Sequence, residues 1–173
     1  EEAEISVREG STCLILSDKS ISNNKASIPS ILTVGAVHSH LVKLGLRGYC
    51  SLNVECSDAL DTHSFAVLIG VGATTVNPYL AIDSIYQRFE KKLFGKSDFE
   101  TCVVKFKKSI DAGLLKIMSK MGISVISSYR GGCNFEAVGL SRAIVSDYFP
   151  GMSSRISGIG VIGIEKKIKE LHA

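Results

Sequence analysis

Short apolar runs alternate with helical patterns along the chain, and this alternation limits the available folds more than any other feature. Four runs predict buried strands: Cys13–Leu16, Tyr49–Glu55, Thr74–Asn77 and Ile123–Ile126. Strands that alternate with helices form parallel sheets with right-handed crossovers. Four strands are about half of the eight that close a barrel. The sequence therefore predicts an α/β fold with a short, mainly parallel sheet and flanking helices, either open or partial-barrel-like.

Turn and capping residues mark the predicted helices. Pro29 suits the first turn of one helix, Asp61 is a candidate N-cap of the next, and Pro78 opens a third. The charged segment Glu1–Gly10 is typical of a helix tail that ends at a glycine. The predicted helices span 30–44, 62–71, 79–93, 97–121, 141–148 and 164–171, and residues 152–163 are predicted to be irregular.

The longest predicted helix leads into the most informative part of the chain. Ser97 and Glu100 form a capping-box pattern at its start, and Gly122 suits the left-handed position at its end. The run 123–126 follows as a predicted strand. Asn134 is predicted to cap a further helix that carries residues 135–138.

The turn Arg130-Gly131-Gly132 is the candidate anion-binding site, because it is predicted to lie between a strand end and a helix start. Glycine N–H groups, a helix N-terminus and a guanidinium together suit a phosphate or a carboxylate. A tight turn in which Arg130 pairs with an acid such as Glu136 explains the same residues. We favour this second interpretation, because glycine turns usually serve backbone geometry.

The histidines predict no metal site. His38 and His40 are two residues apart and point to different sides of a helix, and His63 lies in another helix without ligands at suitable spacing. No arrangement of catalytic residues is legible, so no catalytic residue is assigned. The candidate domain-interface residues are His38, His40, His63, Asn77, Tyr79, Ser128 and Tyr129.

Composition excludes several classes of protein. A net charge of +3, with basic residues interleaved with acids along helices, predicts no nucleic-acid partner. No run approaches the ~18 apolar residues of a membrane span, so no membrane is predicted. The five cysteines are odd in number and include no C-x-x-C pair, which is typical of reduced, buried thiols.

Several longer segments, in order along almost the whole chain, resemble the central domain of the glutamate synthase large chain. The most specific is GLLKIMSKMGISVISSYRG at 113–131. The others are IPSILTVGAVHSHL at 28–41, HSFA at 63–66 leading to VNPYL at 76–80, FEAVGL at 135–140, and SRI with GIG within 154–160.

The resemblance implies that residues 1–173 are a single domain, a fragment from the carboxyl-terminal part of that central domain. Its topology is then related to the FMN-binding TIM barrel that follows it. The whole enzyme converts glutamine, 2-oxoglutarate and a reductant into two glutamates, with FMN and an iron–sulfur cluster in other parts. The segment itself then carries no cofactor. It links the amidotransferase and FMN domains, which are its partners, and its interface candidates help wall the ammonia tunnel. The implied location is the cytoplasm, or the plastid of a photosynthetic eukaryote.

Some positions depart from the family pattern. Ser39 interrupts a usual histidine run, Thr62 stands where another histidine is common, and Gly132-Cys133 replaces Ala-Gln. A stand-alone diverged remnant that binds an anion or a flavin is therefore an alternative. A homodimer of the isolated segment, through faces meant for other domains, is a further one and predicts a large exposed apolar patch.

Overall fold

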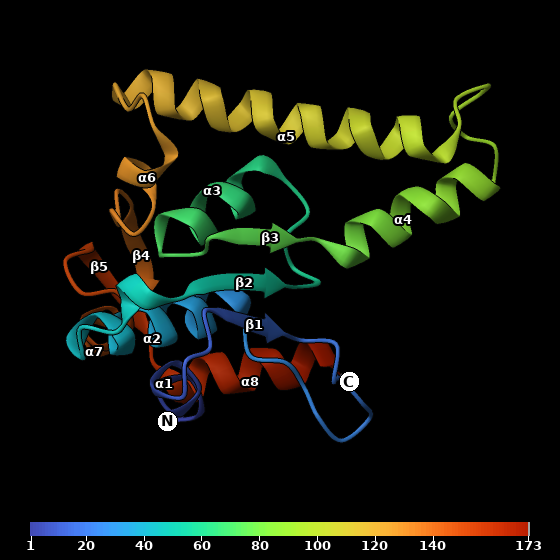
Figure 1. The fold of residues 1–173 in the computed structure, drawn as a ribbon. Coiled ribbons are helices and arrows are strands. Elements are labelled where there is room, and N and C mark those ends of the chain that lie inside the picture. Colours follow the sequence, from blue (N-terminus) through green and yellow to red (C-terminus); the bar gives the residue numbers. More distant parts are fainter. Residues whose placement is uncertain (173) are drawn as a thin grey trace.

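The first three predicted strands form one parallel sheet. The computed structural model describes residues 1–172 and places β1 (Cys13–Ser17), β2 (Ser51–Glu55) and β3 (Thr75–Asn77) in the order β1-β2-β3 (Figure 1). Leu14 pairs with Leu52, and Val54 pairs with Val76. Because each crossover adds the next strand on the same side, same-handed crossovers keep their helices on one face.

Helices bury one face of this sheet. They are α1 (Glu2–Arg8), α2 (Ser30–Lys43) and α3 (Thr62–Gly70), and α2 runs behind the strands in Figure 1. Leu14, Leu52 and Val54 alternate with more exposed residues and are at most 9% exposed. The helix side chains that form hydrophobic clusters with these strand residues include Val7, Val34, Leu41, Phe65 and Leu68.

The boundaries of α2 and α3 follow the predicted signals. Pro29 is the N-cap of α2, and Gly45 follows its end at φ +69°. Asp61 caps α3 by accepting a hydrogen bond from the Ser64 N–H at 2.8 Å. The prediction that a strand begins at Tyr49 is wrong, because Arg47–Tyr49 form a short 3₁₀ turn, η1, before β2.

Two helices form an arm outside α3. They are α4 (Tyr79–Glu90) and α5 (Phe99–Met121), and α5 lies above α3 in Figure 1. The rings of Tyr86 and Phe99 meet edge to face at 5.4 Å, which holds α4 against α5. Gly122 ends α5 at φ +71°, as predicted. The capping-box prediction is wrong, because Asp98 rather than Ser97 caps α5 by accepting from the Thr101 N–H at 2.6 Å.

The predicted strand at 123–126 is wrong. The N–H of Ile123 donates to the Met118 carbonyl at 2.9 Å, so this residue completes the end of α5 instead of joining a sheet. Tyr129 then anchors the segment at 1% exposure beside Ala66 and Met118. The local backbone closes into the short helix α6 (Ile126–Tyr129).

The end of the chain contains a second, separate parallel pair, β4 (Glu136–Leu140) and β5 (Ser153–Ile159). The predicted helix after Asn134 and the predicted irregular segment 152–163 are therefore both wrong. Gly158 allows this pairing, because a Cβ there would lie 2.1 Å from the Gly139 carbonyl oxygen. The helices α7 (Arg142–Tyr148) and α8 (Val161–His172) follow β4 and β5 respectively.

The predicted α/β class, with short parallel strands and flanking helices, is confirmed. No barrel closes within residues 1–172, because the strands form one sheet of three and one of two.

Substitution of Gly158 by alanine should destabilise the β4–β5 pair, because the new methyl group meets the backbone of Gly139. Overpacking of this kind costs about 1–3 kcal/mol. Hydrogen exchange of the β4 and β5 amides measures the effect. Gly160→Ala is the matched control, since a Cβ there meets only Ser141 Oγ at 3.9 Å. Equal exchange rates in both variants would contradict the predicted strand contact.

Substitution of Asp98 by alanine should lower the Tm by a few degrees and speed amide exchange in the first turn of α5, because the cap of Thr101 is lost. Ser97→Ala should leave both quantities unchanged. A larger effect of Ser97→Ala than of Asp98→Ala on Tm and amide exchange would support the capping box predicted from sequence.

Candidate functional site

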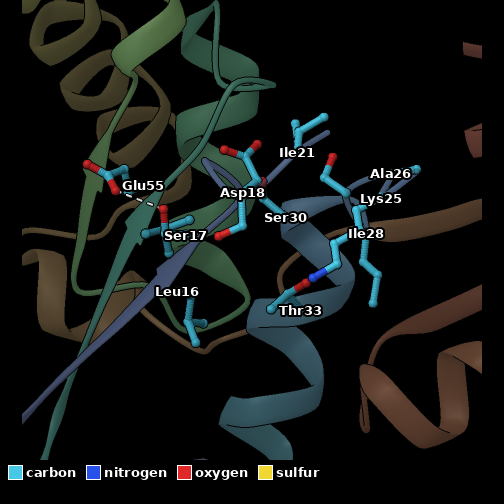
Figure 2. A pocket seen from close by; sticks show the side chains of 13 residues that line it. Leu16, Ser17, Asp18, Ile21, Lys25, Ala26, Ile28, Ser30, Thr33 and Glu55 are labelled. Atoms are coloured by element: carbon cyan, nitrogen blue, oxygen red, sulfur yellow. Dashed lines mark hydrogen bonds between the residues drawn. The ribbon is translucent and has the colours of Figure 1, made fainter. Parts of the chain in front are cut away.

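Glu55 is the centre of a hydrogen-bonded cluster at the carboxyl edge of the three-stranded sheet. Its carboxylate accepts from Ser17 Oγ at 2.8 Å, from Lys19 Nζ at 2.8 Å and from Asn77 Nδ2 at 3.2 Å (the Ser17 bond is dashed in Figure 2). Hydrogen bonds from Lys19 and Ser17 hold the pKa of Glu55 below its usual range. Lys19 Nζ also lies 5.0 Å from the ring centre of Tyr79. The cluster thus ties together the carboxyl ends of all three strands.

Two aspartates fix the loop that follows β2. Asp18 accepts from the Ser57 N–H at 2.8 Å and from Ser57 Oγ at 2.7 Å. Burial by itself would raise the pKa of Asp18, but these hydrogen bonds outweigh it and lower the pKa. Asp58 accepts from the N–H and Oγ of Ser30 at 3.0 and 2.6 Å, which joins the loop to the start of α2. Burial and the Asp18 carboxylate raise the pKa of Tyr79.

A pocket of about 320 Å³ opens beside the carboxylates of Asp18 and Glu55 (Figure 2). Its walls are the end of β1, the loop before α2 and the first turns of α2. This volume is at the lower limit of pockets that hold small molecules. Ser17 and Glu55 at its rim bond to each other, and Asp18 bonds to Ser57. Most polar groups of the rim therefore bond to one another, whereas Asp18 Oδ1 is buried without a hydrogen-bond partner within residues 1–172.

Cys56 and Cys133 are not set up as nucleophiles. Burial, with Asp58 nearby, raises the pKa of Cys56 to about 11, so its thiol is protonated at neutral pH. Burial also raises the pKa of Cys133. Within residues 1–172, no group of three His, Cys, Asp or Glu side chains is arranged to hold a metal ion. An iron–sulfur cluster needs several thiolates at one centre, and these residues do not fit one.

A cationic cluster occupies the opposite, amino edge of the sheet. Arg47 Nε donates to His38 Nδ1 at 3.1 Å, and its Nη1 and Nη2 donate to the carbonyls of Cys50 at 2.6 Å and Gly72 at 2.9 Å. Burial and the Arg47 charge lower the pKa of His38, so the imidazole is neutral at neutral pH.

The predicted anion-binding turn lies against this cluster. A Cβ on Gly131 would lie 3.1 Å from both Cε1 and Nε2 of His38. The N–H groups of Gly131 and Gly132 donate to the Ile69 and Tyr129 carbonyls, both at 3.2 Å, so these amides are already used. β4 also stands where a helix N-terminus was predicted. The Arg130 side chain is therefore the remaining donor of this turn, and its anion site stays a prediction.

The alternative pairing of Arg130 with Glu136 is wrong, because the ion pair of Glu136 is with Arg155, at 3.6 Å.

The other predicted residues lie apart. His40 Nε2 meets Glu4 Oε2 at 3.0 Å and joins α2 to α1. His63 and Ser128 are exposed on α3 and α6, whereas Tyr129 is buried with its ring 6.2 Å from that of Phe135. The structure thus gathers Asn77 and Tyr79 at one sheet edge, and His38, Arg130 and Gly131 at the other. The interface and tunnel roles of all seven candidates stay predictions.

Sequence reasoning did not single out Glu55 or Arg47. Glu55 carried a usable signal, because it ends a predicted strand whose neighbour ends in Ser17-Asp18-Lys19. Arg47 carried none, because its role depends on where the loop before β2 folds.

Comparison with known proteins shows where such a segment occurs. A family model described as the glutamate synthase central domain matches residues 1–141. The chain is 60% identical to the glutamate synthase (NADPH) large chain of Azospirillum brasilense, with 100% of this chain and 11% of that protein aligned. It is 43% identical to the same-named protein of Bacillus subtilis, with 99% of this chain and 11% of that protein aligned. It is 40% identical to the ferredoxin-dependent glutamate synthase of Pyropia yezoensis, with 100% of this chain and 12% of that protein aligned.

The chain therefore spans about a tenth of the length of these curated relatives. The family model covers most of the chain, and the alignments cover nearly all of it. The chain belongs to the glutamate synthase central domain family.

Proposed function

We propose that this chain is a non-catalytic segment of a glutamate synthase large chain. It links the amidotransferase and FMN domains and helps wall the ammonia tunnel between them. The whole enzyme converts glutamine, 2-oxoglutarate and a reductant into two glutamates, and FMN and an iron–sulfur cluster belong to its other parts. The enzyme acts in the cytoplasm, or in the plastid of a photosynthetic eukaryote.

The observation that carries this proposal is the free face of the three-stranded sheet. On the face opposite α2, Ile15 is 67% exposed, and Cys13, Ser17, Thr75 and Asn77 are also exposed within residues 1–172. Parallel sheets occur almost only with both faces covered. This face therefore suits a neighbouring part of a longer polypeptide.

The side chains of the free face support a role as a polar wall. Asn53 Nδ2 donates to Cys13 Sγ at 2.7 Å, and Thr75 Oγ1 donates to Asn53 Oδ1 at 2.5 Å. These bonds run across the strands, and with the Glu55 cluster they continue to the carboxyl edge. Hydroxyl and amide groups both donate and accept hydrogen bonds, as ammonia does.

The state of the edge carboxylates supports a structural role over a catalytic one. Glu55 and Asp18 have lowered pKa values because protein donors bind them. A general base works best with a pKa near the operating pH and with a free lone pair facing its substrate. Both groups have a lowered pKa and tie a loop to the sheet, Glu55 through Lys19 and Asp18 through Ser57.

Replacement of Ile15 by lysine in the glutamate synthase large chain that contains this segment tests the covered face. A charge at a buried contact is costly, so we expect a lower Tm and a leaking tunnel. Leakage means that each glutamine yields one glutamate and free ammonia, whereas synthesis from added ammonium is retained. The glutamate formed from glutamine, the glutamate formed from 2-oxoglutarate and the free ammonia are measured in the same reaction.

The matched control is Leu115→Lys on α5, since Leu115 is 65% exposed and lies on the arm away from the sheet. It should remain fully coupled. If Ile15→Lys is as stable and as coupled as this control, the free face is not covered and the proposal fails.

A further inference from the structure

We propose that Arg130, His38 and Arg47 form a binding site for an oxyanion, a carboxylate or a phosphate, at the amino edge of the sheet. This site does not rest on the function proposed above, because its argument uses only the charges and contacts of these three side chains.

Arg130 brings to this edge a half-buried guanidinium without an ion-pair partner in residues 1–172. Its Nε is buried and has no hydrogen-bond partner among the residues that the structure describes. None of the ion pairs within residues 1–172 includes Arg130 or Arg47. A guanidinium is always protonated, and burying its donors without an acceptor is unfavourable. An anion at Arg130 removes this cost.

His38 supplies a second donor on the same side. Its Nδ1 accepts the Arg47 Nε–H at 3.1 Å, so the neutral ring carries its proton on Nε2. Nε2 faces the turn after Arg130, because the Cβ position of Gly131 lies 3.1 Å from it. The hydrogen bond from Arg47 thus selects the tautomer whose Nε2–H faces the turn at Gly131, next to Arg130 in the chain.

Arg47 orients the site and adds positive charge. Three of its nitrogens are held by His38 and by the carbonyls of Cys50 and Gly72, so its position is fixed. Burial and repulsion by the Arg130 guanidinium lower the pKa of Arg47. Two cations that repel each other at a half-buried edge are stabilised by an anion beside them.

The chemistry of the donors defines the ligand class. The planar fork of an arginine matches carboxylate and phosphate oxygens in a bidentate geometry. The glycine amides of the turn are already bonded, so recognition depends on side chains. The oxyanion has two sources, a free small molecule or an aspartate or glutamate side chain from another segment of the longer polypeptide.

Crystals of the full-length polypeptide soaked in selenate separate these sources. An anomalous selenium peak within hydrogen-bond distance of the Arg130 guanidinium supports a free anion. A carboxylate from another segment at that position supports the side-chain source. A guanidinium that contacts only water at saturating selenate overturns the proposal.

Variants of Arg130 give an independent measurement. For a free anion, Arg130→Gln should raise the selenate concentration for half-occupancy at least about tenfold, because a charge-assisted contact is lost. For a side-chain source, the same variant should lower the Tm of the full-length polypeptide. In both cases Arg130→Lys, which keeps the charge but loses the fork, should be intermediate.

Lys116→Gln, which removes an exposed charge from α5, is the control and should change neither quantity. If Arg130→Gln matches this control in both occupancy and Tm, the site does not exist.

Discussion

Parallel pairing of β1, β2 and β3 is the constraint on which the rest of the structure depends. Parallel strands cannot be joined by hairpins, so each needs a crossover, and each crossover helix must bury its apolar side on the sheet. α2 and α3 meet this requirement with Val34, Leu41 and Leu68. They in turn provide the surfaces on which α5 and α7 pack. Gly35 of α2 leaves room for the Phe149 ring, since a Cβ there would lie 2.4 Å from it.

The same constraint explains why the first half of the fold could be predicted and much of the second half could not. The limits of α2 and α3 depend on local signals, such as Pro29 and Asp61, that act within one or two turns. The conformation of 123–126 depends on how α5 ends and on the packing of Tyr129 against Ala66, and that of 136–140 depends on its pairing with β5. The run that begins at Ile123 forms a turn because its first amide completes the end of α5, and Glu136–Leu140 form a strand because Gly158 lets β5 approach. Periodicity cannot distinguish these outcomes in runs so short.

The candidate site shows the same division. Asn77 and Tyr79 could be placed at the carboxyl edge, because the ends of parallel strands meet at one edge of a sheet. The partnership of His38 with Arg47 could not be foreseen, since it depends on the 3₁₀ turn that replaces the start of the predicted strand. The sequence left two interpretations of the glycines after Arg130, an anion site and the favoured tight turn, and in the structure their amides bond to the end of α3 and to Tyr129.

The two edges of the sheet differ in one physical respect, which is whether their charges are matched. At the carboxyl edge, Lys19 and Ser17 bond Glu55, and Ser57 bonds one oxygen of Asp18, whose other oxygen, Oδ1, is buried without a partner within residues 1–172. At the amino edge, two guanidiniums and a neutral imidazole meet no acid within residues 1–172. A buried charge without a partner is destabilising, so an anion from outside these residues would stabilise the amino edge. The free face of the sheet, on which Ile15 is exposed, would likewise be stabilised by a segment packed on it. A neighbouring segment that covers Ile15 and the polar groups around it and brings a carboxylate to the amino edge would stabilise both places in one contact.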